Sequence, residues 1–294
     1  MIKIRVPATS ANLGPGFDCL GIALNLYNTF YFEEIDKGIE FIGCDEKFQN
    51  KNNLVYTSMQ NCFDQIGYKS RGIKIKMHCD IPVSRGLGSS AACILGGVMA
   101  ASEIASAALS KNEILEIAAK IEGHPDNLSP ALYGGMAVSI KDKEKIYVQQ
   151  IKLNKKFKFC ALIPDFTLST EKARSVLPKL VPYEDALFNI GRTALLIASL
   201  SNGNMDMIRI GCEDKLHQDH RGKLINNYAD ITEKCKGLNT KGVFLSGAGP
   251  TIMNIINEED EEFDVEIIKY LSVLKDKWEV KQLDIDYKGA ITYK

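Results

Sequence analysis

A segment rich in glycine and serine, between a predicted strand and a run of small residues, constrains this fold more than any other feature. Ile73–Ile81 alternates apolar and polar residues as a strand does, and leads directly into Pro82–Ala92 (PVSRGLGSSAA). From Ser89 to Leu109 the residues are small and apolar, and Glu103 carries the only charge. A helix of this composition can pack closely on every side, so we expect it at the centre of a domain.

Strands and helices are mixed along the whole chain, which predicts an α+β fold. The Lys-rich stretch near Lys155 is the expected boundary between domains at 1–155 and 156–294. Expected strands are 2–6, 20–34, 73–81, 136–140, 147–153, 159–163, 242–245, 251–256 and 279–287; expected helices are 52–66, 89–109, 110–122, 170–177, 183–235 and 261–275. The helix at 110–122 opens with a capping box, Ser110 and Glu113.

The charge balance bears on the kind of partner. The chain has 36 Lys and Arg against 37 Asp and Glu, a net charge of −1, which argues against a nucleic-acid partner. Apolar runs stay shorter than the ~18 residues of a membrane span, and Met1–Val6 reads as a strand instead of a signal peptide. We therefore expect a cytoplasmic protein with no membrane partner.

Cysteine and histidine spacing gives little support to a metal or redox site. The eight cysteines are scattered singly, without a Cys-x-x-Cys pair, and are expected to be reduced and mostly buried. His217 and His220 can share a helix face, but no third ligand is close in sequence. A surface or substrate-side role is favoured over zinc.

The glycine-rich segment Gly86–Ala91 allows several interpretations. A structural turn with a serine cap needs fewer glycines and serines than are present. A dinucleotide site fits the loose G-x-G-x-x-A pattern but lacks an acidic residue about 20 positions on at a strand end, and a Walker loop would need a lysine. A triphosphate cradle of backbone amides, with Ser89 or Ser90 available to a magnesium ion, fits best.

A carboxylate should then complete the metal site. Glu122 lies seven positions after Leu115, about two helical turns, so these two side chains share the apolar face of their helix, whereas Glu116 lies on the polar side with Lys120. A carboxylate at the end of an apolar stripe needs a cation near it. Glu122 is therefore preferred over Glu116 as the metal ligand.

Four ordered motifs resemble those of the GHMP small-molecule kinases, a family of ATP-dependent enzymes that phosphorylate sugars, homoserine and mevalonate. The second motif, Pro82–Ala92, is similar to the family's phosphate loop. The others resemble the members that act on homoserine: Pro7–Gly21 (PATSANLGPGFDCLG), Glu122–Gly135 (EGHPDNLSPALYGG) and Leu245–Thr251 (LSGAGPT).

The resemblance implies a two-domain α+β fold, with an N-terminal domain like ribosomal protein S5 domain 2 and a ferredoxin-like C-terminal domain. It implies transfer of the γ-phosphate of ATP to the side-chain hydroxyl of L-homoserine, giving O-phospho-L-homoserine on the route to threonine. Mg²⁺ is the implied cofactor, and a homodimer is a common assembly in the family.

The resemblance also assigns roles to residues by position. It assigns a catalytic role to Asp126 and Asn127, and binding of the metal ion to Ser90 and Glu122. It assigns substrate binding to Asn12, Asp18, His124, Asn127, Arg174, Arg221 and Gly247. It assigns nucleotide binding to Pro82, Val83, Ser84, Arg85, Gly86, Leu87, Gly88, Ser89, Ser90, Ala91 and Ala92. An aspartate suits the ammonium group of homoserine and a guanidinium suits its carboxylate, while Arg85 is expected to face solvent or phosphate.

Two alternatives stay open. A related kinase would use another hydroxyl acceptor, such as threonine or mevalonate, although mevalonate has no ammonium group for Asp18. A catalytically silent nucleotide sensor is the alternative from another class, and intact Ser89, Ser90, Glu122 and Asp126 argue against it. The proton acceptor is also open between Asp126, its neighbour Asn127 and the substrate itself.

Overall fold

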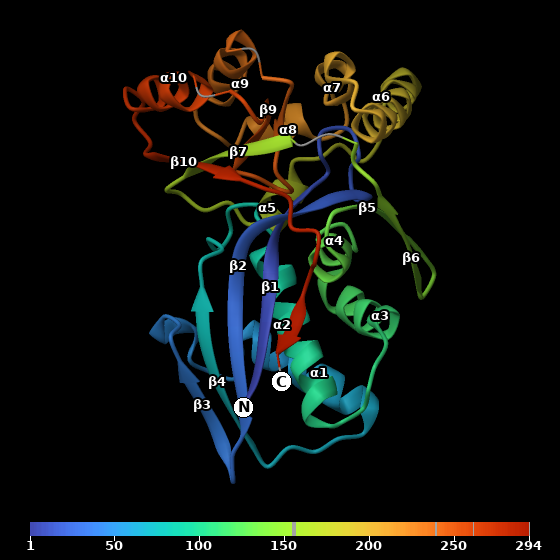
Figure 1. Cartoon of the computed structure of the whole chain (residues 1–294), viewed down its shortest axis with the longest axis vertical. Helices are drawn as coiled ribbons and strands as arrows, with labels where there is room; N and C mark the ends of the chain where they lie inside the picture. Colours follow the sequence, from blue (N-terminus) through green and yellow to red (C-terminus); the bar gives the residue numbers. More distant parts are fainter. Residues whose placement is uncertain (155–156, 239, 261, 294) are drawn as a thin grey trace.

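The computed structural model describes residues 1–154, 157–238, 240–260 and 262–293, which form two sheets with their covering helices (Figure 1). The strands are β1 Ile2–Ala11, β2 Leu20–Glu34, β3 Gly38–Ile42, β4 Gly72–Cys79, β5 Met136–Asp142, β6 Lys145–Ile151, β7 Phe157–Pro164, β8 Gly242–Leu245, β9 Ile252–Asn257, β10 Trp278–Leu283 and β11 Ile291–Tyr293. The helices are α1 Leu54–Ile66, α2 Ser89–Ile104, α3 Lys111–Glu122, α4 Leu128–Tyr133, α5 Thr170–Ser175, α6 Tyr183–Asn202, α7 Met205–Gly211, α8 Gln218–Gly222, α9 Tyr228–Gly237 and α10 Glu262–Leu271, with a short 3₁₀ helix at Glu46–Phe48.

The long strand β2 organises the first sheet. Its second half pairs with β4 and its first half with β5, and β1 runs antiparallel along its other edge. Ile4 opposes Phe30 in the β1–β2 register, and both side chains are fully buried. The loop between β1 and β2 is therefore carried at the end of the sheet that faces the second sheet (Figure 1).

Helix α2 is central, as its composition predicts. A Cβ on Gly96 would lie 2.6 Å from the ring of Phe30, and one on Gly97 would lie 2.3 Å from the carbonyl oxygen of Val55 in α1. The two glycines therefore let α2 touch the sheet on one side and α1 on the other. The helix ends at Ile104, before the predicted Leu109, because Ser106 and Ala108 take left-handed backbone angles.

The second sheet has the order β10-β7-β9-β8, with every pair antiparallel. This is strand order 4-1-3-2 of a ferredoxin-like unit, which the resemblance implied. Ile231 of α9 and Phe263 of α10 pack with Leu162 and Ile252 in one buried cluster. These two helices therefore cover the side of the sheet that faces away from the first sheet (Figure 1).

The end of the chain returns to the first sheet. Strand β11, unpredicted from sequence, pairs with β1 at Lys3 opposite Tyr293, and the two chain ends lie close together in Figure 1. Ile285 also bridges to Leu24 of β2. The predicted junction between residues 155 and 156 lies outside the described residues.

The helical stretch predicted from Tyr183 to Cys235 was wrong in its continuity. Gly203 ends α6 in a left-handed conformation, and Asn227 takes φ 58° immediately before α9. Between them, Asp214 accepts hydrogen bonds from the backbone amides of His217 and Gln218 and starts α8. Side-chain and glycine stop signals therefore divide the segment into α6, α7, α8 and α9.

Candidate active site

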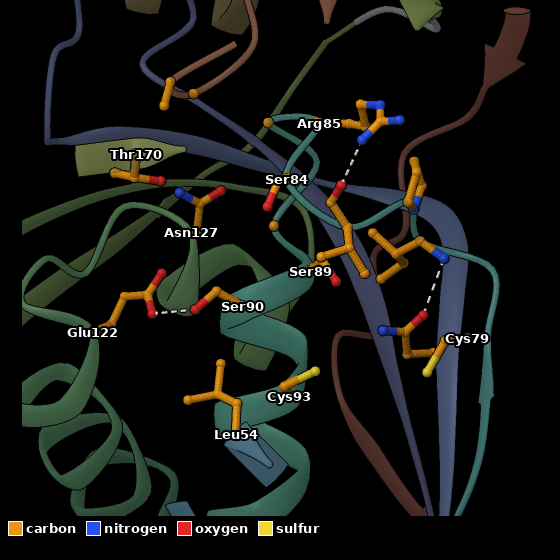
Figure 2. A pocket seen from close by; sticks show the side chains of 18 of the residues that line it. Leu54, Cys79, Ser84, Arg85, Ser89, Ser90, Cys93, Glu122, Asn127 and Thr170 are labelled. Carbon is orange, nitrogen blue, oxygen red and sulfur yellow. Dashed lines mark hydrogen bonds between the residues drawn. The ribbon is translucent and has the colours of Figure 1, made fainter. Parts of the chain in front are cut away.

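Both halves of the chain line one cavity of about 820 Å³. Its wall includes the loop before α2, the loop after β1, the segment after α3, helix α5 and the turn after β8. All the predicted substrate and metal residues line it, and so do Asp126 and every predicted nucleotide residue except Leu87, Ala91 and Ala92, which are buried in the core. Figure 2 shows Asn127 and Thr170 across from Ser84 and Ser90, the Ser89 side chain turned the other way, and Leu54 and Cys93 further along the cavity.

The loop before α2 follows a path that side chains would obstruct. A Cβ on Gly86 would lie 2.3 Å from the carbonyl oxygen of Ser246, and one on Gly88 would lie 2.0 Å from the Thr9 hydroxyl. Both glycines also have positive φ, 78° and 71°. Gly88 gives α2 no side-chain cap, so the first amides of this helix are available to an anion in the cavity.

The turn Ser246–Pro250 does more than join β8 and β9. The Ser246 hydroxyl donates to the carbonyl oxygen of Gly86 at 2.7 Å and lies 2.7 Å from the Ser10 hydroxyl. The backbone amide of Thr251 donates to the carbonyl oxygen of Arg85. The turn therefore holds the loop before α2 against the end of β1.

Arg85 is half-buried at the cavity and makes contacts beyond the expected one with solvent or phosphate. Its guanidinium donates to the carbonyl oxygens of Val83, Pro164 and Asp165, at 2.9, 2.8 and 2.7 Å. Pro164 ends β7, so Arg85 ties the loop before α2 to the second sheet. A nucleotide contact of its side chain stays a prediction.

Ser90 and Glu122 meet at the cavity wall, where the Ser90 hydroxyl donates to Glu122 Oε2 at 2.7 Å (Figure 2). Ser90 lies in the first turn of α2, and Glu122 is the last residue of α3. Burial raises the pKa of Glu122, and the hydrogen bond from Ser90 offsets part of that shift. Glu122 lines the cavity, whereas Glu116, the alternative ligand, does not.

Asp126 orders the residues around it. Its Oδ1 lies 2.9 Å from His124 Nδ1 and accepts from the backbone amide of Asn127 at 2.9 Å, and its carboxylate is almost wholly buried. The Asn127 side-chain oxygen accepts from the Thr9 hydroxyl at 2.8 Å. Burial lowers the pKa of His124, but the hydrogen bond and charge of Asp126 outweigh burial, so the net shift is upward.

The loop after β1 is shaped by its own polar side chains. Asn12 and Asp18 take left-handed angles, with φ 71° and 57°. The Asn12 amide group donates to the carbonyl oxygen of Gly247 at 2.8 Å, and its oxygen accepts from the backbone amide of Asp18 at 3.0 Å. Asn12 therefore places the Asp18 carboxylate, which makes a two-point ion pair with Arg174 of α5.

Arg221 is a buried cation, 1% exposed, on α8. It donates to the carbonyl oxygens of Ala173 and Gly247 and to His217, and no described carboxylate forms an ion pair with it. Burial, reinforced by the charge of Arg174, lowers the pKa of Arg221 to about 10. Asp18, Asp126 and Asp214 offset part of that shift without forming an ion pair, so a buried guanidinium at the cavity wall remains available to an anionic ligand.

Sequence reasoning assigned no individual role to Thr9, Phe17, Thr170 or Ser246, and its surface alternative for His217 was wrong, because that side chain is 0% exposed. His217 lies four residues before Arg221, the spacing of neighbours on a helix, and this was the available signal. Thr9 and Ser246 belong to the motifs Pro7–Gly21 and Leu245–Thr251, but their partners Asn127 and Gly86 lie 118 and 160 positions away, so the sequence did not show which contacts they make.

Comparison with known proteins agrees with this arrangement. Residues 53–135 match the family model of the GHMP kinase N-terminal domain. The chain is 57% identical to a homoserine kinase of Clostridium botulinum strain Langeland over 99% of its own length and 98% of that protein. The chain belongs to the homoserine kinase family. A second member of this family, from Clostridium botulinum strain Alaska E43, is 50% identical over 100% of the chain and 99% of the relative.

Solved structures place the homoserine kinase fold in a wider group. The Cytophaga hutchinsonii homoserine kinase superposes with a TM-score of 0.88 at 25% identity, covering 99% of this chain and 97% of that one. A Leishmania major mevalonate kinase, solved with R-mevalonate, superposes with a TM-score of 0.74 at 15% identity, covering 96% and 95%. The α+β GHMP kinase fold expected from the four motifs is therefore confirmed. Within the described part of the chain, no helix is both long and apolar enough to cross a membrane.

Proposed function

We propose that this homoserine kinase family member transfers the γ-phosphate of ATP to the side-chain hydroxyl of L-homoserine, giving O-phospho-L-homoserine on the route to threonine. One observation carries the proposal: the buried cation Arg221 lines the same cavity as the phosphate loop Gly86–Ser90. A single cavity can thus hold an anionic amino acid group and a nucleotide phosphate together. Phosphoryl transfer requires mainly this positioning, with little covalent chemistry by the protein.

The nucleotide side of the cavity suits a triphosphate. The uncapped start of α2 and the glycine path before it offer backbone amides to phosphate oxygens. Leu54 and Ile81 line the apolar end of the cavity, where we place the base of ATP. The nucleotide role assigned to Pro82–Ala92 is supported by this lining, except that Leu87, Ala91 and Ala92 act from the core beneath the loop.

Ser90 and Glu122 fit a Mg²⁺ site. They supply two oxygen ligands of the kind Mg²⁺ prefers, 2.7 Å apart, and burial of Glu122 favours a cation beside its carboxylate. No group of three or more His, Cys, Asp or Glu side chains in the described residues could hold a metal alone, so phosphate oxygens and water would complete the coordination. When bound, Mg²⁺ neutralises the charge on the transferring phosphate.

The substrate side matches the three polar groups of homoserine. Arg221, with Arg174, is placed to bind the carboxylate, and Asp18 to bind the ammonium group. Gly247 contributes through its backbone, because its carbonyl oxygen accepts hydrogen bonds from the side chains of Asn12 and Arg221 and holds both in place. We assign the hydroxyl to the side of the cavity formed by His124 and Asn127.

Asp126 and Asn127 form the proposed catalytic pair. Asp126 holds His124 and the Asn127 backbone in place, and Thr9 fixes the Asn127 side chain, so the hydroxyl meets groups that do not need to reorganise. As the hydroxyl oxygen bonds to the γ-phosphorus, the bond from that phosphorus to the β,γ-bridging oxygen breaks, ADP leaves, and the hydroxyl loses its proton. Asp126 or an oxygen of the transferred phosphate accepts it.

An acceptor panel tests the proposal. ATP and Mg²⁺ are supplied with L-homoserine, L-threonine or mevalonate, and ADP release is followed while ³¹P NMR identifies the product. We expect O-phospho-L-homoserine as the main product. Faster turnover of threonine or mevalonate would contradict the acceptor, and ATP binding without turnover of any acceptor would favour a nucleotide sensor.

We further propose the division into domains 1–155 and 156–294, a cytoplasmic location and a homodimer. All eight cysteines are free, which suits a reducing compartment. Helix α6 exposes Leu187 and Ile190, at 50% and 66%, as a surface for a second copy. Light scattering should give the mass of a dimer for the wild type and of a monomer for Ile190→Glu; a monomeric wild type would contradict the assembly.

A further inference from the structure

His217 is a buried side chain whose proton position is defined by its contacts. It is 0% exposed, and its Nε2 lies 2.8 Å from the carbonyl oxygen of Gly14 in the loop after β1. Because a carbonyl oxygen only accepts, Nε2 must carry the hydrogen. Burial lowers the pKa of His217, which favours the neutral imidazole, so Nδ1 has a free lone pair.

That lone pair faces Arg221. Nη1 of Arg221 lies 3.3 Å from His217 Nδ1, and the same guanidinium donates to the carbonyl oxygens of Gly247 and Ala173. Three acceptors therefore fix Nε and Nη1. No acceptor among the described residues engages Nη2, which leaves it for a ligand of the cavity that Arg221 lines.

Phe17 adds a second contact between the same groups. Its ring stacks on the imidazole of His217, with centroids 5.0 Å apart and planes at 25°. The guanidinium of Arg221 lies 5.0 Å from the Phe17 centroid, and that of Arg174 lies 5.6 Å from it. His217 and Phe17 together form a platform beside both arginines of the substrate site.

The backbone of His217 is fixed by a further hydrogen bond. Its backbone amide donates to Asp214 at 2.9 Å, and the Asp214 carboxylate also accepts from Asn189 at 2.7 Å. These contacts fix the start of α8 before any ligand binds. The position of the imidazole is therefore set by the fold, and not by the ligand.

We infer that His217 is a positioning residue: it holds the guanidinium of Arg221 toward the carboxylate of an amino-acid substrate and joins it to the loop that carries Asp18. This inference rests on the proposed function. A histidine that only fills the core would affect folding and both substrates alike. A positioning histidine acts on the amino acid through Arg221.

Substitution of His217 by Asn or by Gln distinguishes the roles of its two ring nitrogens. In His217→Asn the side-chain oxygen can replace Nδ1 as acceptor for Arg221, whereas in His217→Gln the amide nitrogen can replace Nε2 as donor to Gly14. We expect the homoserine KM of H217Q to exceed that of H217N by roughly 3- to 10-fold, the effect of one hydrogen bond, at equal ATP KM. Equal homoserine KM values, or a parallel rise in the ATP KM, would overturn the inference.

A double substitution tests whether the effect passes through Arg221. In an Arg221→Lys background, H217Q should raise the homoserine KM no further, while independent, multiplied effects would overturn the inference. His220→Gln, on the same helix and outside the cavity, is the matched control. If the wild type forms no phosphohomoserine, the proposed function fails; if it does and the variants behave alike, only the role of His217 fails.

Discussion

Asp18 and Arg174 form a two-point ion pair across the cavity, with Oδ1–Nη2 at 2.6 Å and Oδ2–Nη1 at 3.0 Å. Asp18 belongs to the loop after β1 and Arg174 to α5 in the second half of the chain. Each charge therefore neutralises the other when no substrate is present. A zwitterion can replace this pair with two new ones, whereas a ligand with a single charge leaves one partner unpaired.

We therefore predict that both charges of the acceptor are required. Removing the ammonium group, as in 4-hydroxybutyrate, should lower kcat/KM by roughly 100-fold or more, because a charged group loses its partner. Coupled ADP release with L-homoserine and with this analogue measures the ratio. Similar kcat/KM values for the two acceptors would show that Asp18 does not contact the ammonium group.

Glu122→Gln should lower turnover with ATP and Mg²⁺ by at least roughly 10-fold, because an amide is a poor ligand for Mg²⁺. The same variant should have an equal or higher Tm, since burial makes the charged carboxylate costly in the empty protein. Glu116→Gln is the control and should alter turnover little. Mild, equal effects of both substitutions on turnover would remove Glu122 from the metal site.

Arg221→Ala should act on the amino acid and leave nucleotide binding nearly unchanged. A hydrogen bond to a charged group contributes about 1.5–3 kcal/mol, so the homoserine KM should rise by roughly 10- to 150-fold. Steady-state kinetics with each substrate varied in turn, and circular dichroism as a check on folding, provide the measurement. An unchanged homoserine KM in the folded variant would contradict the assignment of the carboxylate to Arg221.

His217 should make the protein less stable in mild acid. Burial lowers its pKa, while Asp214 and Asp18 oppose that shift and Arg221 adds to it. The unfolded chain then takes up a proton near pH 6.5 that the folded protein does not. As pH falls below that value, the free energy of unfolding should decrease by at most about 1.4 kcal/mol per pH unit from this group.

Urea unfolding of the wild type and His217→Gln between pH 7.5 and 5.5 isolates this contribution. The difference in unfolding free energy between the two proteins should change with pH in favour of the variant as the solution becomes more acidic. Parallel curves would show that the folded-state pKa of His217 is close to its ordinary value. His220→Gln is again the matched control.

Local chemistry made much of the site predictable. Glycines that the loop before α2 requires, the capping box at Ser110 and the helical phase of Glu122 all depend on residues a few positions apart. The composition of small, apolar residues also predicted the central position of α2. These features were read correctly because their physical causes lie within one element and its neighbours.

Two of the features that were missed depend on contacts between distant segments. The hydrogen bonds of Arg85 with Pro164 and Asp165 could not be predicted, because only the packing of the two halves brings these carbonyl oxygens within reach. Strand β11 has three residues and no strong pattern, so its pairing with β1 needed the whole chain. The break of the predicted helix 183–235 has local causes instead: Gly203 ends α6, and Asp214 accepts backbone amides three and four residues ahead, neither of which the apolar periodicity shows.

The sequence by itself determined the kind of chemistry: a loop that backbone amides can present to phosphate, a carboxylate in phase with it, and a family of enzymes. The tertiary structure alone decided how the charges are paired. It joined Asp18 to Arg174, left Arg221 buried with no ion pair among the described residues, and set Gly14 against the imidazole of His217. Charge pairing depends on distances between segments separated by 150 or more positions, as with Asp18 and Arg174 at 156, and these distances are fixed only when the two sheets pack.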